Sequence, residues 1–344
     1  MSIDGKSVLG ITVGDPGGIG PEITAKALSQ RDIYETCCPL VVADAGFMAD
    51  VLRFTGLSLK LRKIAKPREG LFECGTMDIL HVPNMKTDQL RYKEVTPEQG
   101  QASFEYVVRV INLALKGDID GTVTGPINKA AINAAGHHFA GHTEIYAKMT
   151  RTKDYAMMLV HGDFRVVHVS THVSLREACD RVKRDRIGRV IDLTYDALTK
   201  LGISDPRIGV AGVNPHCGEE GMFGREDVEE IVPAVEDAVI SGKNVEGPIP
   251  ADTVFPKMKG GMYHAVVVMY HDQGHIPMKL IGFQYDEQTG VWGTMSGVNV
   301  TLGLPIVRTS VDHGTAFGKA GEGRANPQSM IEAIRLAALL AKAT

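Results

Sequence analysis

Three histidines could act together as metal ligands because each follows an apolar stretch of chain. His172, His216 and His271 each stand within three residues of the end of such a stretch. A single histidine in this position more often packs in the core or lies on the surface, but three placed alike suggest a shared cation. Neutral imidazoles suit zinc, cobalt or similar divalent ions, and three protein ligands leave coordination positions open for a substrate.

Five apolar stretches in all end in a cluster of polar and turn-forming residues. The clusters are 14–22, 124–129, 170–172, 214–216 and 270–275. In open α/β sheets, ligands bind outside the carboxyl ends of the strands, so we expect these clusters to converge on one site. Asp272 and His275 flank His271, and either could orient its ring.

Several other side chains are typical of an anion-binding site. The segment Gly141-His142-Thr143-Glu144 leads from a glycine into an apparent helix, which could seat a phosphate or carboxylate, or could simply be capped by Thr143. Arg308 stands inside an apolar strand, so its guanidinium either pairs with an internal carboxylate or reaches a ligand anion. Lys279 is either a similar cation or a lysine whose ammonium reaches solvent.

Two glycine-rich segments could approach a ligand closely. Residues 14–20 lack the G-x-G-x-x-G spacing, so the usual dinucleotide-binding fingerprint is absent. Residues 313–321 form a second glycine-rich loop after a strand. Its small residues would admit a flat or phosphorylated ligand, although the same residues also suit a surface turn.

These residues need a scaffold that gathers strand ends, and the chain has the alternating pattern of an α/β protein. Thr96 and Pro97 are expected to open a helix that stops before Gly117, and Asn326 and Pro327 to open the last helix. The expected strands are Val8 to Val13, Leu40 to Ala43, Asp78 to Val82, Gly121 to Thr124, Ala156 to Val160, Arg165 to Ser170, Ile208 to Val213, Ala265 to Tyr270 and Ile306 to Ser310.

Length and composition narrow the possible classes of protein. A length of 344 residues predicts two domains of about 150 residues each. Because no linker separates them, we expect two interleaved lobes. The net charge of −4 argues against nucleic acid or an anionic membrane surface as a partner. Five cysteines without a CxxC pair favour a reducing cytoplasm, and the first residues resemble neither a signal peptide nor a membrane span.

The sequence resembles the family of 4-hydroxythreonine-4-phosphate dehydrogenase. The resemblance rests on GDPGGIGPE, TGPINK, GHTE, STH, NPHCGE, YHDQGHIPMK and VNVTLGLPIVRTSVDHGTA, which follow in order from Gly14 to Ala316. It implies the α/β fold of isocitrate and isopropylmalate dehydrogenases, with two interleaved α/β/α lobes and the active site in the cleft between them. We place the lobes at 1–127 with 290–344, which carries the cofactor loop, and at 128–289, which carries the metal ligands and dimer contacts.

The resemblance also implies an enzyme that uses NAD and one divalent metal per subunit, either zinc, magnesium or cobalt. Such an enzyme oxidises the C3 hydroxyl of a four-carbon phosphorylated acid and then releases carbon dioxide. The family's metal site is shared across a homodimer, which implies a homodimer here. By motif, His172, His216 and His271 match the metal ligands, and His142, Thr143, Lys279, Asn299 and Arg308 match the substrate-binding positions.

The loop from His313 resembles the adenosine-side cofactor loop of the superfamily, which assigns Gly314, Thr315 and Ala316 to the cofactor. Gly318 stands where the superfamily commonly has an aspartate, so this chain departs from the pattern there.

Two departures favour a paralogous branch of the family. Residues 280–298 form a longer segment than we expect for the pyridoxine-pathway enzyme, and His275 to Lys279 differ from its usual run. Both features resemble 4-phospho-D-threonate and 4-phospho-D-erythronate 3-dehydrogenase, whose product would be dihydroxyacetone phosphate. The alternative substrate is 4-hydroxythreonine 4-phosphate of pyridoxal phosphate biosynthesis, which carries an amino group at C2.

The proton acceptor and the protein class each keep more than one interpretation. Lys279 and Asp272 are both candidate bases, because a desolvated lysine can titrate near neutrality and an aspartate beside a metal can accept a proton or orient a ligand. A phosphoacyl transferase of similar fold and a non-catalytic metabolite sensor are the other classes. The sensor would need an output module, and the sequence shows none.

Overall fold

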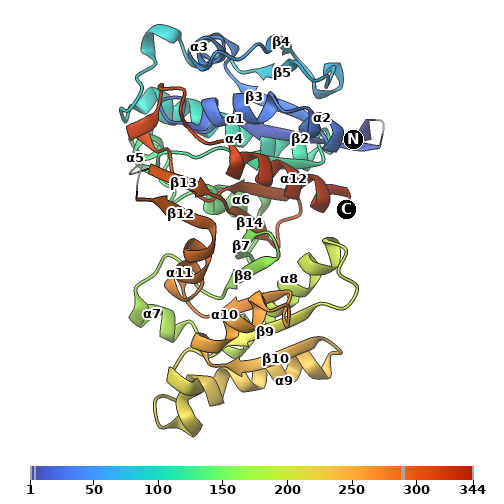
Figure 1. Cartoon of the computed structure of the whole chain (residues 1–344), viewed down its shortest axis with the longest axis vertical. Coiled ribbons are helices and arrows are strands. Elements are labelled where there is room, and N and C mark those ends of the chain that lie inside the picture. Colours follow the sequence, from blue (N-terminus) through green and yellow to red (C-terminus); the bar gives the residue numbers. More distant parts are fainter. Residues whose placement is uncertain (1, 4, 288–290, 343–344) are drawn as a thin grey trace. The chain divides into compact units, whose positions relative to one another are not determined.

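The protein is described by a computed structural model that covers residues 2–3, 5–287 and 291–342 (Figure 1). It divides into two compact units. Unit 1 comprises Met1–Lys153 and Leu304–Thr344, and unit 2 comprises Asp154–Gly303. Each unit contains both strands and helices, so the predicted α/β class is confirmed.

Unit 1 contains a parallel sheet in the order β15-β6-β2-β3-β5-β4, with β1 antiparallel to β2. The helices α4 and α12 pack on its central strands. Strands such as β3 and β6 are completely buried. The strands are β1 (Ser2–Ile3), β2 (Lys6–Thr12), β3 (Cys38–Ala43), β4 (Lys60–Ile64), β5 (Thr76–His81), β6 (Gly121–Thr124) and β15 (Val307–Val311). The helices are α1 (Gly20–Leu28), α2 (Arg31–Thr36), α3 (Ala45–Thr55), η1 (Pro67–Glu69), η2 (Thr87–Gln89), α4 (Pro97–Leu115), α5 (Lys129–Ala134), α6 (His142–Thr150), η5 (Phe317–Lys319) and α12 (Gln328–Lys342).

Unit 2 contains a mixed sheet in the order β10-β9-β11-β8-β7-β14, in which β7 runs antiparallel to both of its neighbours. The helices α8, α10 and α11 pack on this sheet. Its strands are β7 (Ala156–His161), β8 (Phe164–His168), β9 (Arg207–Ala211), β10 (Asn244–Ile249), β11 (Ala265–Val268) and β14 (Val298–Leu302), and β12 (Phe283–Asp286) pairs with β13 (Val291–Met295) in a separate hairpin. Its helices are α7 (Leu175–Asp180), α8 (Arg184–Lys200), η3 (Pro215–Gly221), η4 (Asp227–Ile231), α9 (Val232–Ile240), α10 (Ala251–Lys259) and α11 (His271–Gly282).

The unit boundaries lie at 153/154 and 303/304, whereas the sequence suggests lobe boundaries at 127/128 and 289/290. Helices α5 and α6 therefore belong to unit 1. The physical reason is that Ile132, Ile145 and Tyr146 are buried in one apolar cluster with Val107 and Ile111 of α4. Residue 290, at the expected boundary, and residues 288–289 of the long 280–298 segment lie outside the described residues.

Every expected strand is present within two residues of its predicted ends. The predicted helix ends are also confirmed, because Thr96 Oγ1 accepts a hydrogen bond from Gln99 N and Asn326 Oδ1 accepts one from Gln328 N. The strands β4 and β10 are not predicted by the sequence pattern. They lie at the sheet edges, where charged residues and a Gly247-Pro248 pair replace apolar alternation. No helix among the described residues is long and apolar enough to cross a membrane.

Candidate active site

Arg308, on β15, lies in the interior of unit 1 with only 3% of its surface exposed. Its Nη2 donates a hydrogen bond to Thr124 Oγ1 at 3.0 Å, and its guanidinium lies 5.6 Å from the ring centroid of Tyr146. Burial lowers the pKa of Arg308 to about 10, and the neighbouring Tyr146 opposes this effect. A guanidinium in such surroundings offers a planar fork to a phosphate or carboxylate.

Tyr146 of α6 lies against this guanidinium, a role that the sequence pattern does not predict. The residue is fully buried, and its hydroxyl donates to Thr122 Oγ1 at 3.0 Å. Burial raises the pKa of Tyr146 to about 12, so the hydroxyl stays protonated. Because Tyr146 faces the core at a helical position where any aromatic residue could pack, only the fold reveals that its ring lies beneath a cation.

His142 is the first residue of α6, and the positive charge of Arg308 affects its pKa. Its Nε2 is buried and has no hydrogen-bond partner within the described residues. Burial first, and then the charge of Arg308, hold the pKa of His142 well below its usual value, so the ring is neutral at pH 7. A neutral imidazole can donate a hydrogen bond to an anion without adding a second buried charge.

Thr143 lies in the first turn of α6 and is not its N-cap. The helix begins at His142, and Gly141 is the capping residue, so the capping interpretation of Thr143 is wrong. Ala140 N donates to Glu144 Oε2 at 2.7 Å and fixes this turn. The first N–H groups of a helix have no partner within the helix itself, and the role of Thr143 in binding substrate stays a prediction.

The predicted cofactor residues Gly314, Thr315 and Ala316 lie on a loop of unit 1 that approaches the segment before α1. Ile19 N donates to Thr315 O at 3.0 Å, and a Cβ on Gly18 would lie 3.0 Å from Thr315. By contrast, a Cβ on Gly314 would meet nothing within 4 Å, so the outer side of the loop is open to a ligand. The loop is thus anchored on one side and accessible on the other, and its contact with a cofactor stays a prediction.

In unit 2, two of the three predicted metal ligands lie close together. The rings of His172 and His271 are 5.6 Å apart, and His275 stacks on His271 with 3.6 Å between ring centroids. His271 Nδ1 is 2.7 Å from Asp272 Oδ1, the contact expected of a residue that orients a ligand. With Nδ1 occupied in this way, Nε2 of His271 is the nitrogen left for a cation.

His216 lies on a separate segment, η3, whose backbone is left-handed. His216 has φ 51° and ψ 31°, and Cys217 and Glu219 also have positive φ, a conformation that is unfavourable for residues other than glycine. The buried carboxylate of Asp227 holds this segment, since it accepts hydrogen bonds from Val213 N at 2.9 Å and Asn214 Nδ2 at 2.9 Å. Asp227 is a positioning residue that the sequence does not reveal.

A single chain does not assemble all three predicted metal ligands. Within the described residues, no group of three or more His, Cys, Asp or Glu side chains is arranged to hold a metal ion. The donors His172 and His271 suit a divalent metal in their chemistry, but His216 does not join them in this chain. The described residues of one subunit therefore do not fit a complete metal centre.

The other two predicted substrate residues also lie in unit 2. Lys279, on α11, places its Nζ 4.2 Å from the ring centroid of Phe283. Asn299, on β14, has a buried Oδ1 with no hydrogen-bond partner in the part of the chain that is described. Asn299 thus offers a ligand an acceptor, and Lys279 offers it an ammonium group held against an aromatic face.

Comparison with known proteins identifies the family. The family model for "Pyridoxal phosphate biosynthetic protein PdxA" matches residues 35–337. The chain belongs to the PdxA family. A "Putative D-threonate 4-phosphate dehydrogenase" of Symbiobacterium thermophilum is 45% identical over 341 residues, which is 99% of this chain and 98% of that protein. Its counterpart in Oceanobacillus iheyensis is 43% identical over 343 residues, 98% of both chains.

A solved structure agrees with this PdxA-family assignment. The crystal structure of 4-hydroxythreonine-4-phosphate dehydrogenase from Klebsiella pneumoniae has a TM-score of 0.86 and 41% identity, and the match covers 98% of both chains. The resemblance inferred from the motifs is therefore confirmed, together with the fold. Since these relatives are dehydrogenases, the chain is an oxidoreductase.

Proposed function

We propose that this PdxA-family chain oxidises the C3 hydroxyl of 4-phospho-D-threonate or 4-phospho-D-erythronate with NAD and then releases carbon dioxide to leave dihydroxyacetone phosphate. The observation that carries the proposal is the group of Arg308 and His142 in unit 1, whose buried guanidinium and neutral imidazole suit a phosphorylated acid. The names of the Symbiobacterium and Oceanobacillus relatives favour the threonate substrate.

In this proposal Arg308 and His142 bind one anionic end of the acid and hold it in place for the reaction. The Arg308 fork contributes two parallel N–H donors, and Tyr146 and Thr124 keep the fork in one orientation. NAD, when bound, accepts the hydride from C3. The residues of the 314–316 loop would contact this cofactor, because the loop is anchored through Thr315 and open at Gly314.

Proton transfer falls to Lys279 in this proposal. Asp272 is already engaged with His271 Nδ1 and so acts by orienting that ring, whereas the Lys279 ammonium faces an aromatic ring. When C3 becomes a ketone, its hydroxyl proton must pass to a base, and we assign that role to Lys279 Nζ acting as an amine. The C1 carboxylate is then β to the ketone, so the C1–C2 bond can break, carbon dioxide leaves, and C2 takes up a proton.

We further propose a homodimer in which a divalent ion, zinc, magnesium or cobalt, is held by histidines of two subunits. Two observations support this: His216 is not grouped with His172 and His271 within one chain, and α11, which begins at His271, carries exposed apolar side chains. Ile276 and Leu280 are 66% and 81% exposed, and their spacing of four residues puts them on one face of the helix.

The dimer proposal predicts that Ile276→Glu with Leu280→Glu converts the protein to a monomer. Light scattering after size exclusion would report the mass, and elemental analysis of the same fractions would report bound metal. Loss of both together is expected, because a monomer would lack the complete set of ligands. Glutamate at the exposed Ile240 of α9 is the matched control. A double variant that remains dimeric would show that α11 is not at the interface.

The catalytic proposal is tested by measuring NADH formation with three substrates side by side: 4-phospho-D-threonate, 4-phospho-D-erythronate and 4-hydroxythreonine 4-phosphate. NADH with either acid, accompanied by dihydroxyacetone phosphate and carbon dioxide, is the expected result. NADH only with 4-hydroxythreonine 4-phosphate would favour the pyridoxal phosphate pathway instead. No NADH with any of the three would overturn the proposed function, and acyl exchange without NADH would indicate a phosphoacyl transferase.

A further inference from the structure

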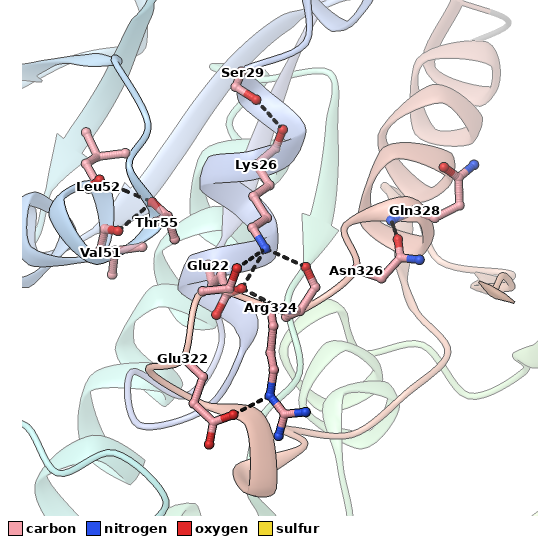
Figure 2. A network of polar contacts seen from close by, with 12 residues as sticks. Glu22, Lys26, Ser29, Val51, Leu52, Thr55, Glu322, Arg324, Asn326 and Gln328 are labelled. Carbon is pink, nitrogen blue, oxygen red and sulfur yellow. Dashed lines mark hydrogen bonds and ion pairs between the residues drawn. The ribbon is translucent and has the colours of Figure 1, made fainter. Parts of the chain in front are cut away.

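A polar clasp in unit 1 joins α1 to the end of the glycine-rich loop. Lys26 Nζ donates hydrogen bonds to Gly323 O and Ala325 O, each at 2.8 Å, and forms an ion pair with Glu22 Oε1 at 2.7 Å. Glu22 Oε1 also accepts a hydrogen bond from Ala325 N at 2.6 Å. Figure 2 shows these contacts converging on the Lys26 ammonium from the helix and the loop.

The clasp is more than a surface ion pair. The Glu22 side chain is only 1% exposed and that of Lys26 is 20% exposed, so water screens the pair little. The ammonium directs its hydrogen bonds to one carboxylate and two carbonyl oxygens, which matches its three N–H donors. Removal of Lys26 would leave both the Glu22 carboxylate and the loop carbonyls without this partner, a large penalty at a buried position.

The loop is held at its other end as well. Ile19, directly before α1, donates its N–H to Thr315 O, and the ring of Tyr92 lies against Gly321, where a Cβ would come within 3.0 Å of it. The first turns of α1 and the residue before it therefore hold the segment 315–325 at both ends. Between these ends Ala316 has a φ of 43°, a conformation that is unfavourable for a residue other than glycine and that contacts from the surrounding chain must maintain.

We propose that Glu22 and Lys26 are positioning residues that hold the 314–325 loop in the conformation that binds the dinucleotide cofactor. The inference rests on the proposed function, in which Gly314, Thr315 and Ala316 contact NAD. A ligand's apparent affinity falls in proportion to the fraction of protein in the binding conformation. Hence a loop that is released from Lys26 should bind NAD more weakly while the Arg308 group keeps its affinity for the phosphorylated acid.

The test is Lys26→Met, which keeps a long side chain but removes the charge and the donors. We expect the dissociation constant for NAD, measured by titration without the acid, to rise about tenfold, if the loop is then ordered in about one molecule in ten. The KM for NAD should rise similarly while the KM for the phosphorylated acid stays constant. Amide hydrogen exchange across 314–325, without any cofactor, should accelerate.

Three further variants make the result decisive. Lys26→Arg should restore most of the affinity, and Glu22→Gln should give an intermediate loss because it can still accept from Ala325 N. Arg335→Met is the matched control, because it also removes a cation of unit 1. Arg335 of α12 forms an ion pair with Asp32 of α2, outside the loop. If Lys26→Met does not fold, Glu22→Gln and Lys26→Arg carry the comparison.

The outcomes separate the two proposals. Unchanged NAD affinity and unchanged loop exchange in Lys26→Met would overturn the clasp while leaving the dehydrogenase proposal intact. Equal rises in the KM for NAD and the KM for the acid would indicate general damage to the fold and would also overturn the clasp. A wild-type protein that neither binds NAD nor forms NADH would overturn both.

Discussion

Replacement of Arg308 by methionine should stabilise the unliganded protein while sharply lowering its kcat/KM for phosphorylated acids. Methionine carries no charge and matches the arginine side chain as far as Nε, so it can fill the inner part of the same buried position on β15. The guanidinium is 3% exposed, and burial lowers its pKa to about 10. These values show that the folded chain disfavours the charged form of this side chain.

The size of the effect follows from the pKa. The pKa of Arg308 lies roughly 2.5 pH units below that of an ordinary arginine, and at about 1.4 kcal/mol for each pH unit this corresponds to about 3 kcal/mol. Because the folded pKa is lowered, the unfolded chain binds the proton more tightly, and at pH 7 the charge therefore opposes folding. Loss of the hydrogen bond to Thr124 offsets about 1 kcal/mol. The loss of its other polar contacts and the space left by the guanidinium offset more, so we expect a net gain of at most about 2 kcal/mol in the free energy of unfolding.

The functional effect should have the opposite sign. A charge-assisted pair between a buried guanidinium and a ligand anion is worth about 2–5 kcal/mol, so kcat/KM for the phosphorylated acid should fall by about 1.5 to 3.5 orders of magnitude. Arg308→Lys should keep part of the binding, because it retains the charge but loses the fork.

Thermal unfolding with and without the phosphorylated acid measures both effects in one experiment. For Arg308→Met we expect a higher Tm without ligand and no further rise when the acid is added. The wild type should show the reverse, a lower starting Tm that rises with the acid. A variant that melts well below the wild type and is still stabilised by the acid would show that Arg308 is a structural residue, and the reasoning would be refuted.

Two further predictions concern residues that the fold places near the proposed ligands. The pKa of His142 is lowered in the folded chain, so its contribution to stability is fully present above the unfolded pKa of about 6.5 and falls below that pH by up to about 1.4 kcal/mol per pH unit. His142→Gln should therefore flatten the decline of Tm between pH 6.5 and 5, and an unchanged profile would contradict the assignment. Asp227→Ala removes a fully buried carboxylate that holds the His216 segment. Urea denaturation should show a free energy of unfolding lower by about 2–3 kcal/mol, and elemental analysis should show less bound metal. The control Asp237→Ala, at an exposed ion pair, should change neither quantity.

Local patterns in the sequence were enough for the elements and for the family. A buried parallel strand needs a run of Val and Ile, and a helix needs a cap, so β2, β6 and α4 can be recognised from a few neighbouring residues. The polar clusters after those strands, together with the motif order, identified the PdxA family that the comparison then confirmed. Gln99 shows the limit of such rules. Its spacing from Thr96 fits a reciprocal cap, yet its side chain bonds Arg91 N and Glu94 O instead.

The tertiary structure alone decided which distant residues support the site. Lys26 and Gly323 are 297 positions apart, and Arg308 and Thr124 are 184 apart, so neither contact leaves a local pattern in the chain. Tyr146 and Asp227 likewise look like an ordinary core aromatic and an ordinary helix-start carboxylate until the fold brings them to Arg308 and to the His216 segment. The sequence by itself determined which residue types could bind an anion, a dinucleotide and a cation. Folding decided how those residues are held, because hydrogen bonds and burial depend on proximity in space rather than along the chain.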